Sequence, residues 1–357
     1  MQNKIVIPAG YMGSGSSAVT NIISEISGFD INHGSFEYIL LHCPDGLFDL
    51  EDKLLRGNNA LRSDEAIHRF LQCMKKLYKR GYWFSNYKTY LSAEFLRFCE
   101  EFVEALDPVR MDGVYWYFQE NIDTLPNRLE CYVRYVLSLI LHNRMPFGKP
   151  VKPLNYHGLI MAHPDPEQFY AAARAFLEKI YHALGYEQHH LILDQLLLPH
   201  SLSRINNYFD DNARIFVVER DPRDVFILNK YFWYQSSSTI PVPYPLEVSE
   251  FCRYYDRIRR NETPTEDSRI LRLRFEDLIY RYEESLEKIY PFLGVTPEDH
   301  TAKGTIFRPE VSCNNTQLFR KDSQYLPETK IIEKELSPYI YDFPLTTVSA
   351  WAKKQVF

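Results

Sequence analysis

The fold is decided by Lys4-Ile-Val-Ile-Pro8 and by the stretch that follows it, Gly10-Tyr-Met-Gly-Ser-Gly-Ser-Ser17. The first run is short and β-branched, which predicts a buried strand, and the second is a loop rich in glycine and serine. Apolar residues then recur at the spacing of one helix face, at Val19, Ile22, Ile23 and Ile26. A loop between a strand and a helix gathers main-chain N–H groups and the positive helix end, which together bind phosphate.

The loop has the glycine spacing of a nucleotide-binding P-loop, with Ser17 at the Ser/Thr position. Ser16 stands where that motif requires Lys, so the sequence predicts a phosphate cradle without the clamp for a triphosphate. The predicted cradle residues are Gly10, Gly13, Ser14, Gly15, Ser16 and Ser17.

Three further buried strands are predicted downstream, at residues 191–193, 214–218 and 270–273, and each is followed by a helical pattern. These helices begin near Ser201, Pro222 and Glu276. Strands alternating with helices indicate an α/β fold with a P-loop-like, doubly wound parallel sheet flanked by helices. We therefore predict a core of residues 1–48 and 186–357.

Residues 49–185 read instead as a large, mostly helical insertion. Aromatic residues gather in it at 82–87 and 115–117, and we interpret the insertion as the acceptor-binding region. Ordinary packing between helices is the alternative interpretation of these aromatic stretches.

Composition limits the function of the 357-residue chain. Its net charge of −6 argues against duplex nucleic acid as a partner, and the sequence has no apolar run long enough to span a membrane. Six widely spaced cysteines predict thiols in a reducing compartment, and no leader precedes the first strand, so we expect a cytoplasmic protein. His189 and His190 lack the spacing of paired metal ligands, and no metal is predicted.

A second motif is Arg220-Asp-Pro-Arg-Asp224, which directly follows a predicted strand. Asp221 suits the N-cap of a helix, Pro222 its first position and Asp224 the third position of a capping arrangement. Arg220 lies at the carboxyl end of the strand, where open α/β sheets bind ligands, and arginine suits phosphate. We interpret Arg223 as a solvated helix charge rather than as a second phosphate contact.

Taken together, these segments resemble the sulfotransferase family, which uses 3'-phosphoadenosine 5'-phosphosulfate (PAPS) as sulfuryl donor, and in particular its carbohydrate-type, prokaryote-like cytoplasmic members. Residues 10–17 are similar to the family's 5'-phosphosulfate loop and residues 220–224 to its 3'-phosphate motif. Residues 273–278 and 289–294 resemble its late strand, helix and "FLG" turn.

The resemblance implies that Ser14, Gly15, Ser16 and Ser17 hold the 5'-phosphate and that Arg220 binds the 3'-phosphate. It also implies a general base, and Glu37 lies 24 residues after Gly13, a spacing similar to that of carbohydrate sulfotransferases. His33 is the rival base, because other branches of the family use histidine. No metal is needed.

Two positions depart from the family pattern. Many members have a cation where Gly13 stands, and here its role passes to Lys149, Lys152, Arg204 or a C-terminal cation. The family usually has serine eight residues after the 3'-phosphate arginine, but this chain has Leu228 there. Asn229 or Lys230 can take the place of this serine only if the helix register is shifted. Arg320 and Lys321 are further candidates, which would close over the nucleotide from the C-terminal side.

The leading hypothesis is sulfuryl transfer from PAPS to a hydroxyl group of a carbohydrate or glycan precursor, leaving adenosine 3',5'-bisphosphate. Asp194 and Gln195, at the end of a predicted strand, are candidates to face that acceptor. A P-loop kinase using ATP and Mg²⁺ is the alternative enzyme, since Asp194 also suits a Walker B position. A degenerate scaffold that binds nucleotide without turnover is the non-enzyme alternative.

Overall fold

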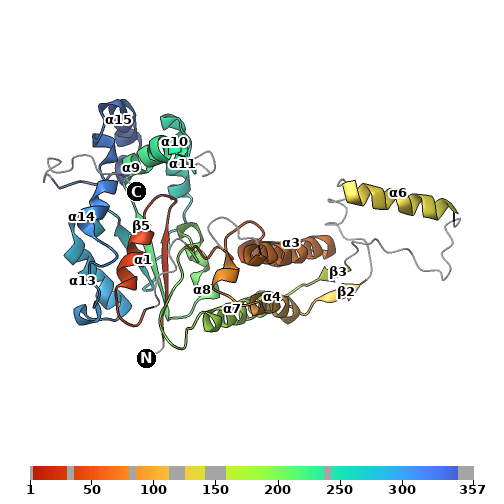
Figure 1. Cartoon of the computed structure of the whole chain (residues 1–357). Coiled ribbons are helices and arrows are strands. Elements are labelled where there is room, and N and C mark those ends of the chain that lie inside the picture. The colour runs from red at the N-terminus through yellow and green to blue at the C-terminus, as the bar shows by residue number, and fades with distance from the viewer. Residues whose placement is uncertain are drawn as a thin grey trace. The chain divides into compact units, whose positions relative to one another are not determined.

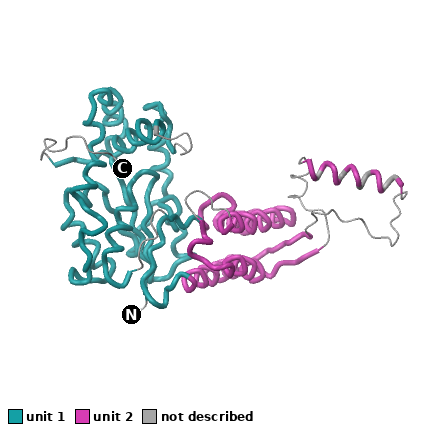
Figure 2. Tube along the Cα trace, viewed as in Figure 1, with its two compact units in different colours: residues 1–39, 184–357 teal, residues 40–183 magenta. Residues whose placement is uncertain are grey.

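A computed structural model of the chain describes residues 3–29, 36–79, 86–111, 125–140, 158–236 and 243–344. The chain divides into two compact units, residues 1–39 with 184–357 and residues 40–183 (Figure 2). The sequence predicts this division after residues 48 and 185. Every predicted core site that lies in the described residues belongs to the first unit, so the unit is described by itself.

The first unit is built on a parallel sheet with strand order β4-β1-β5-β6 (Figure 1). Its strands are β1 (Ile5–Gly10), β4 (Leu191–Ile192), β5 (Ala213–Glu219) and β6 (Ile270–Arg274). The α/β class and the parallel sheet are thereby confirmed. After β1 the chain adds β4 on one side and then β5 on the other, so the order reverses at β1, where such sheets bind ligands.

One face of the sheet is covered by α1 (Ser17–Ser24), α12 (Asp277–Tyr280) and α13 (Tyr282–Leu293) (Figure 1). Val6, Phe216 and Val218 point to this face, because alternate residues of a strand lie on the same side. A second cluster of buried residues joins α9 (Pro222–Ile227), α11 (Val248–Arg260) and α15 (Leu326–Glu335). This second cluster directly follows the end of β5.

The remaining elements of the first unit are short. The α-helices among them are α8 (Ile205–Tyr208), α10 (Tyr234–Ser236) and α14 (Pro309–Ser312). A π-helix, η3 (Leu228–Trp233), interrupts the segment between α9 and α10. The 3-10 turns are η2 (Pro199–Arg204), η4 (Pro297–Asp299), η5 (Cys313–Asn315), η6 (Leu318–Arg320), η7 (Ser323–Tyr325) and η8 (Ser337–Tyr339).

The second unit is mostly helical in its described part. It contains α2 (Leu47–Leu55), α3 (Ala60–Lys79), η1 (Tyr87–Thr89), α4 (Glu94–Ala105), α6 (Leu125–Ile140) and α7 (Pro166–Ala183). Phe70, Phe102 and Phe176 meet between α3, α4 and α7, with ring centroids 5.4 to 6.4 Å apart. No helix in the described ranges is at once long and apolar enough to cross a membrane.

Two local predictions differ from the structure. The helix expected near Ser201 is the 3-10 turn η2 followed by a single turn of α8, since Pro199 begins a tight turn there. A two-stranded antiparallel ribbon, β2 (Val109–Met111) with β3 (Leu159–Met161), was not predicted. Its strands have three residues each and are far apart in sequence, so neither gives a pattern above background.

The end of α1 is held by a buried carboxylate, Glu25. Oε1 of Glu25 accepts from the N–H groups of Ile306 and Phe307 at 2.6 and 2.7 Å. Oε2 lies 2.9 Å from Nε2 of His300, whose Nδ1 lies 2.8 Å from the hydroxyl of Tyr290. These contacts attach the 300–307 segment to α1 and α13, and they satisfy the buried side chains of Glu25 and His300.

Replacing Glu25 with alanine should therefore lower the free energy of unfolding by about 3 kcal/mol, because several buried donors lose their acceptor. The matched control is Glu283→Ala, which removes an exposed pair with Lys303 and should cost about 1 kcal/mol or less. Denaturant unfolding of both variants measures the difference. Equal losses for the two variants would contradict the role of Glu25.

Candidate active site

The carboxyl ends of the four parallel strands bring the predicted site residues to one edge of the sheet. Gly10 pairs with Val218 in register, and Glu219 pairs with Arg274, so β1, β5 and β6 end at similar heights. The residues that follow these ends are the loop from Tyr11, then Arg220, then Phe275 and Glu276, with Asp194 following β4. The sequence alone predicts this convergence for parallel strands.

The glycines of the first loop are required by its shape. Gly13 and Gly15 have φ of +81° and +84°, which other residues rarely adopt. A Cβ on Gly15 would lie 2.7 Å from the ring of Phe275, and a Cβ on Gly10 would lie 2.1 Å from Oγ of Ser14. The Ser14 hydroxyl is therefore folded back over Gly10, buried, and without a hydrogen-bond partner among the described residues.

The same loop leads into α1. Ser16 is the N-cap residue, its side chain makes no capping bond, and the first turn carries no acidic residue. Oγ of Ser16 instead accepts from Nε2 of Gln195 at 2.6 Å. The N–H groups of Ala18 and Val19 donate to the carbonyls of Gly15 and Ser16 at 3.0 and 2.9 Å. The main-chain donors of this helix start that suit a phosphate are therefore those that precede Ala18.

Arg220 is buried at the end of β5, with 3% of its surface exposed. Its guanidinium donates to the carbonyl of Gly13 at 3.0 Å and to the carbonyl of Asn315, and it lies 4.9 Å from the ring centroid of Phe275. Its Nε has no partner among the described residues. Burial lowers the pKa of Arg220, although three nearby carboxyl groups oppose the shift. Arg220 thus joins the loop of residues 10–17 to the 313–316 segment, and its Nε is the donor that these bonds do not use.

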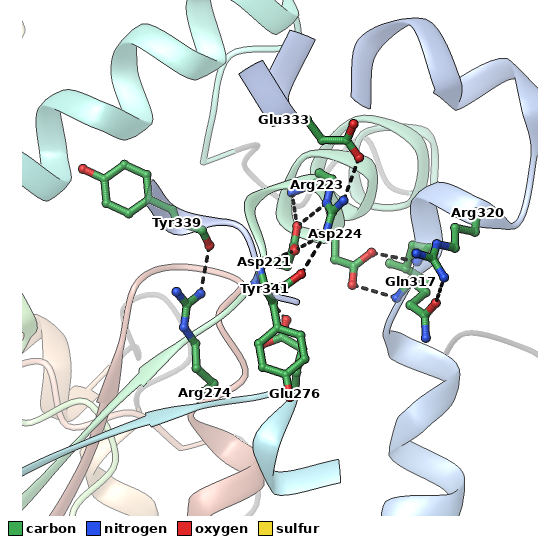
Figure 3. A network of polar contacts seen from close by, with 11 residues as sticks. Asp221, Arg223, Asp224, Arg274, Glu276, Gln317, Arg320, Glu333, Tyr339 and Tyr341 are labelled. Carbon is green, nitrogen blue, oxygen red and sulfur yellow. Dashed lines mark hydrogen bonds and ion pairs between the residues drawn. The ribbon is translucent and has the colours of Figure 1, made fainter. Parts of the chain in front are cut away.

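A network of buried carboxyl groups surrounds this end of β5 (Figure 3). Asp221 caps α9 by accepting from the N–H of Arg223 at 2.8 Å, which confirms the predicted N-cap. Glu276 accepts from the N–H of Asp221 at 2.8 Å. Asp224 accepts from the N–H groups of Gln317 and Leu318 at 2.8 and 2.7 Å. Asp221 at the N-cap of α9, Asp224 within α9 and Glu276 after β6 therefore hold three separate chain segments together.

Two interpretations of this motif were wrong. Arg223 is not a solvated charge: it forms an ion pair with Asp221 at 2.7 Å, reaches Glu333 at 2.7 Å, and lies 4.1 Å from the ring centroid of Phe319. Asp224 does not complete a capping arrangement, because its oxygens bind the C-terminal segment while Glu276 takes the N–H of Asp221. Residues distant in sequence supply these partners, so the local pattern could not reveal them.

The charge of the network is balanced by protonation. Burial raises the pKa of Glu276 to about 8, and the charges of Asp221 and Asp224 add to the shift. Burial and Asp221 likewise raise the pKa of Asp224, while Arg220 opposes the increase. Protonation of Glu276 reduces the negative charge around Arg220.

Glu37 and Asp194 come together on the β4 side of the loop. The N–H of Tyr38 donates to the carbonyl of Asp194 at 2.8 Å, which places Glu37 beside that residue. Asp194 is buried, and burial, with a further contribution from the charge of Glu37, raises the pKa of its carboxyl group to about 8. Gln195 adopts a positive φ of 61°, and its N–H donates to the carbonyl of Pro8.

The other predicted residues are placed less favourably or are outside the described part. The amide of Asn229 pairs with the backbone of Tyr244 at 3.0 Å and is buried, even though η3 supplies a register shift after Leu228. Lys230 pairs with Glu328. The ammonium of Lys321 donates to the carbonyl of Asn314 at 2.6 Å, and Arg320 is exposed and bonds Gln317.

His33, Lys149 and Lys152 lie outside the described residues, and so do the aromatic stretches apart from Asn86 and Tyr87. Tyr87 is fully buried, with its ring 5.2 Å from that of Phe95, so it belongs to the core of the second unit. Gly13 faces the ring of Trp233, which a Cβ would approach within 3.0 Å. Among the residues that the sequence analysis did not assign to the site, Glu276 had one signal, its place three residues after a predicted strand.

Comparison with known proteins finds a family model that matches part of the chain. A family model described as the sulfotransferase family matches residues 151–299, which include β4, β5 and β6 with Arg220 and Glu276. The matched region is therefore similar to the sulfotransferase family. No curated protein matches the chain.

Solved structures similar to the chain have low TM-scores and low sequence identity. The sulfotransferase domain from the curacin biosynthetic pathway is 14% identical at a TM-score of 0.38, covering 96% of this chain and 99% of that one. Sulfotransferase STF9 from Mycobacterium avium is 12% identical at 0.37, covering 95% and 76%. Mouse sulfotransferase SULT7A1, complexed with PAP, is 16% identical at 0.31, covering 67% and 88%. No residue role is drawn from these likenesses.

The raised pKa of Asp194 predicts a pH-dependent stability. The folded state keeps a proton that the unfolded state, with a pKa near 3.8, releases, so this group's contribution to stability is lost as pH rises toward about 8. Asp194→Asn does not titrate, and its melting temperature relative to the unsubstituted protein should rise by about 2 °C or more between about pH 5 and pH 9. Thermal unfolding across that range measures it, and a constant difference would contradict the assignment.

Proposed function

We propose that the chain transfers a sulfuryl group from PAPS to a hydroxyl group of an acceptor. The observation that carries the proposal is the hydrogen bond from Arg220 to the carbonyl of Gly13, which fixes a buried cation against the phosphate loop. A donor with phosphate groups at two positions of one adenosine needs two anion sites at a fixed separation. The loop with its helix start supplies one site, and Arg220 supplies the other.

The residues present fit such a donor. Ser14 has a buried hydroxyl and Arg220 a buried Nε, both without partners among the described residues, and each is a donor that a phosphate oxygen can use. The N–H groups of Ser16 and Ser17 open α1. We assign the 5'-phosphate to this loop and the 3'-phosphate to Arg220, with Lys321 and Arg320 as cations that approach from the C-terminal side. Asn229 would need to release Tyr244 to take part.

Glu37 is the proposed general base. It removes the proton from the acceptor hydroxyl as the oxygen attacks sulfur, and adenosine 3',5'-bisphosphate leaves with the electrons of the broken S–O bond. Because the pKa of Asp194 is raised to about 8, Asp194 is mostly protonated at pH 7, and Glu37 has no full negative charge beside it. His33 remains the rival base. The chain's contribution is otherwise positioning, as in phosphoryl transfer.

The acceptor is proposed to be a carbohydrate or glycan precursor. Two features support this choice, the glutamate base and the aromatic-rich insertion of residues 49–185, where aromatic faces can stack on sugar rings. Asp194 and Gln195 are the proposed acceptor-side residues of the core. The cytoplasmic location likewise stays a prediction.

Calorimetry with two nucleotides tests the proposal against its alternatives. Adenosine 3',5'-bisphosphate should bind at nanomolar to micromolar concentration without Mg²⁺, and labelled PAPS should pass its label to at least one member of a glycan panel. ATP binding that requires Mg²⁺ would favour the kinase. Tight binding of the bisphosphate without transfer to any of several acceptors would favour the degenerate scaffold.

Arg220→Ala should weaken binding of adenosine 3',5'-bisphosphate by roughly 1.5 to 3 kcal/mol, the scale of a charged hydrogen bond. The control is Arg269→Ala, which removes another buried arginine bonded to a main-chain carbonyl, that of Phe209, at the opposite end of β6. Both variants should lose stability, but only the first should lose affinity, measured below its unfolding transition. Unchanged affinity in Arg220→Ala would contradict the 3'-phosphate assignment.

Glu37→Gln should lower turnover about 100-fold or more with nearly unchanged affinity for the bisphosphate, because the amide cannot accept the hydroxyl proton. Steady-state transfer of labelled sulfate measures turnover, and calorimetry measures binding. Glu283→Gln, at the exposed surface, should have no effect on either. Near-normal turnover in Glu37→Gln would transfer the role of base to His33 or to water.

A further inference from the structure

Two cysteines of the second unit face each other at close range. Sγ of Cys43 lies 3.6 Å from Sγ of Cys73, although the residues are 30 positions apart in the chain. Cys43 lies in the turn before α2, and Cys73 lies on α3. A disulfide has an S–S distance near 2 Å, so the bond needs a sulfur movement of about 1.5 Å, within reach of side-chain rotation.

The surroundings hold this pair in place. The N–H of Gly46 donates to the carbonyl of Cys43 at 2.8 Å, and the N–H of Asp45 donates to the carboxylate of Asp49 at 2.7 Å. The thiol of Cys73 also reaches the carbonyl of Pro44 at 3.4 Å. The turn therefore presents the Cys43 sulfur to α3 in a fixed position.

The two thiols differ in exposure and in acidity. Cys43 is buried, whereas Cys73 is half-buried and accessible to a small reagent. The contact with Cys43 lowers the pKa of Cys73, with a contribution from the ammonium of Lys76, against burial and the charges of Asp45 and Asp49. The same contact and burial raise the pKa of Cys43. Because Cys73 is the more exposed of the two sulfurs, it is assigned as the attacking thiolate and Cys43 as the resolving thiol.

We propose that Cys43 and Cys73 form a peroxide-oxidisable dithiol, which is a modification site separate from the sulfuryl-transfer residues. The Cys73 thiolate attacks hydrogen peroxide, the O–O bond breaks, and a sulfenic acid and hydroxide form. The Cys43 sulfur then attacks the Cys73 sulfur, the S–O bond breaks, and the hydroxyl leaves as water with the thiol proton of Cys43. Two thiols are oxidised to one disulfide, and one peroxide is reduced to two waters.

The bridge would fix the turn before α2 to α3. This turn follows Glu37 along the chain, with only residues 38 and 39 between that residue and the N-terminal boundary of the second unit. A reductant that cleaves disulfides restores the two thiols, so the modification is reversible. The proposal does not depend on the sulfuryl-transfer function, since its first readout is the covalent state of the two sulfurs.

Mass spectrometry of the full-length protein tests the site. After treatment with hydrogen peroxide, alkylation and digestion, the peptides containing Cys43 and Cys73 should be linked, with the loss of two hydrogen atoms, and dithiothreitol should separate them. A short pulse of iodoacetamide on the reduced protein should label Cys73 at least about tenfold faster than the buried Cys99. Equal labelling, or a link between Cys73 and another cysteine, would overturn the proposal.

Single variants separate the two roles. In Cys43→Ser, dimedone should trap a sulfenic acid at Cys73 after peroxide treatment, because the resolving thiol is gone. In Cys73→Ser, Cys43 should stay unmodified, and Cys99→Ser should form the link as the unsubstituted protein does. Oxidation of Cys43 in the absence of Cys73 would contradict the order of attack. Unlinked, alkylated Cys43 and Cys73 in the peroxide-treated native protein would refute the site.

Discussion

A buried arginine among carboxyl groups determines how the parts of the candidate site meet. Arg220 joins the carbonyl of Gly13 in the phosphate loop to the carbonyl of Asn315 in the C-terminal segment, while Asp224 receives the N–H groups that follow that segment. A guanidinium does not lose its proton in a protein, so its burial requires compensating acids. This requirement accounts for the acids at the ends of β5 and β6. The bond from Arg220 to Gly13 also fixes the conformation of the loop of residues 10–17.

The same buried acids set the charge around Arg220. Three buried acids, Asp221, Asp224 and Glu276, lie near two arginines, Arg220 and Arg223. The pKa values of Glu276 and Asp224 are raised, so protonation of these groups lowers the excess of negative charge and no further cation is needed. On the other side of the loop, Asp194 is kept neutral beside Glu37 by burial. In the proposed function, the donors at this edge of the sheet bind the phosphate groups and Glu37 accepts the proton. Preorganised donors of this kind stabilise developing charge without rearrangement.

The sequence predicted the sheet and the loop because both depend on local patterns. β-branched runs marked the strands, and the glycine spacing at residues 10–15 marked the loop, where positive φ and the ring of Phe275 exclude a side chain. It did not predict the partners of Arg223 and Asp224, because Glu333, Gln317 and Leu318 are about a hundred residues away. The close pair Cys43 and Cys73 was missed for the same reason, since contact across the 40–79 segment leaves no periodic signal.

A crystal structure of the full chain with adenosine 3',5'-bisphosphate tests the central claim most directly. The account predicts the 5'-phosphate against the main-chain nitrogens of Gly15, Ser16 and Ser17, and the 3'-phosphate within hydrogen-bonding distance of the guanidinium of Arg220. A nucleotide bound elsewhere, or an Arg220 that keeps only its two carbonyl partners while the bisphosphate occupies the loop, would contradict it.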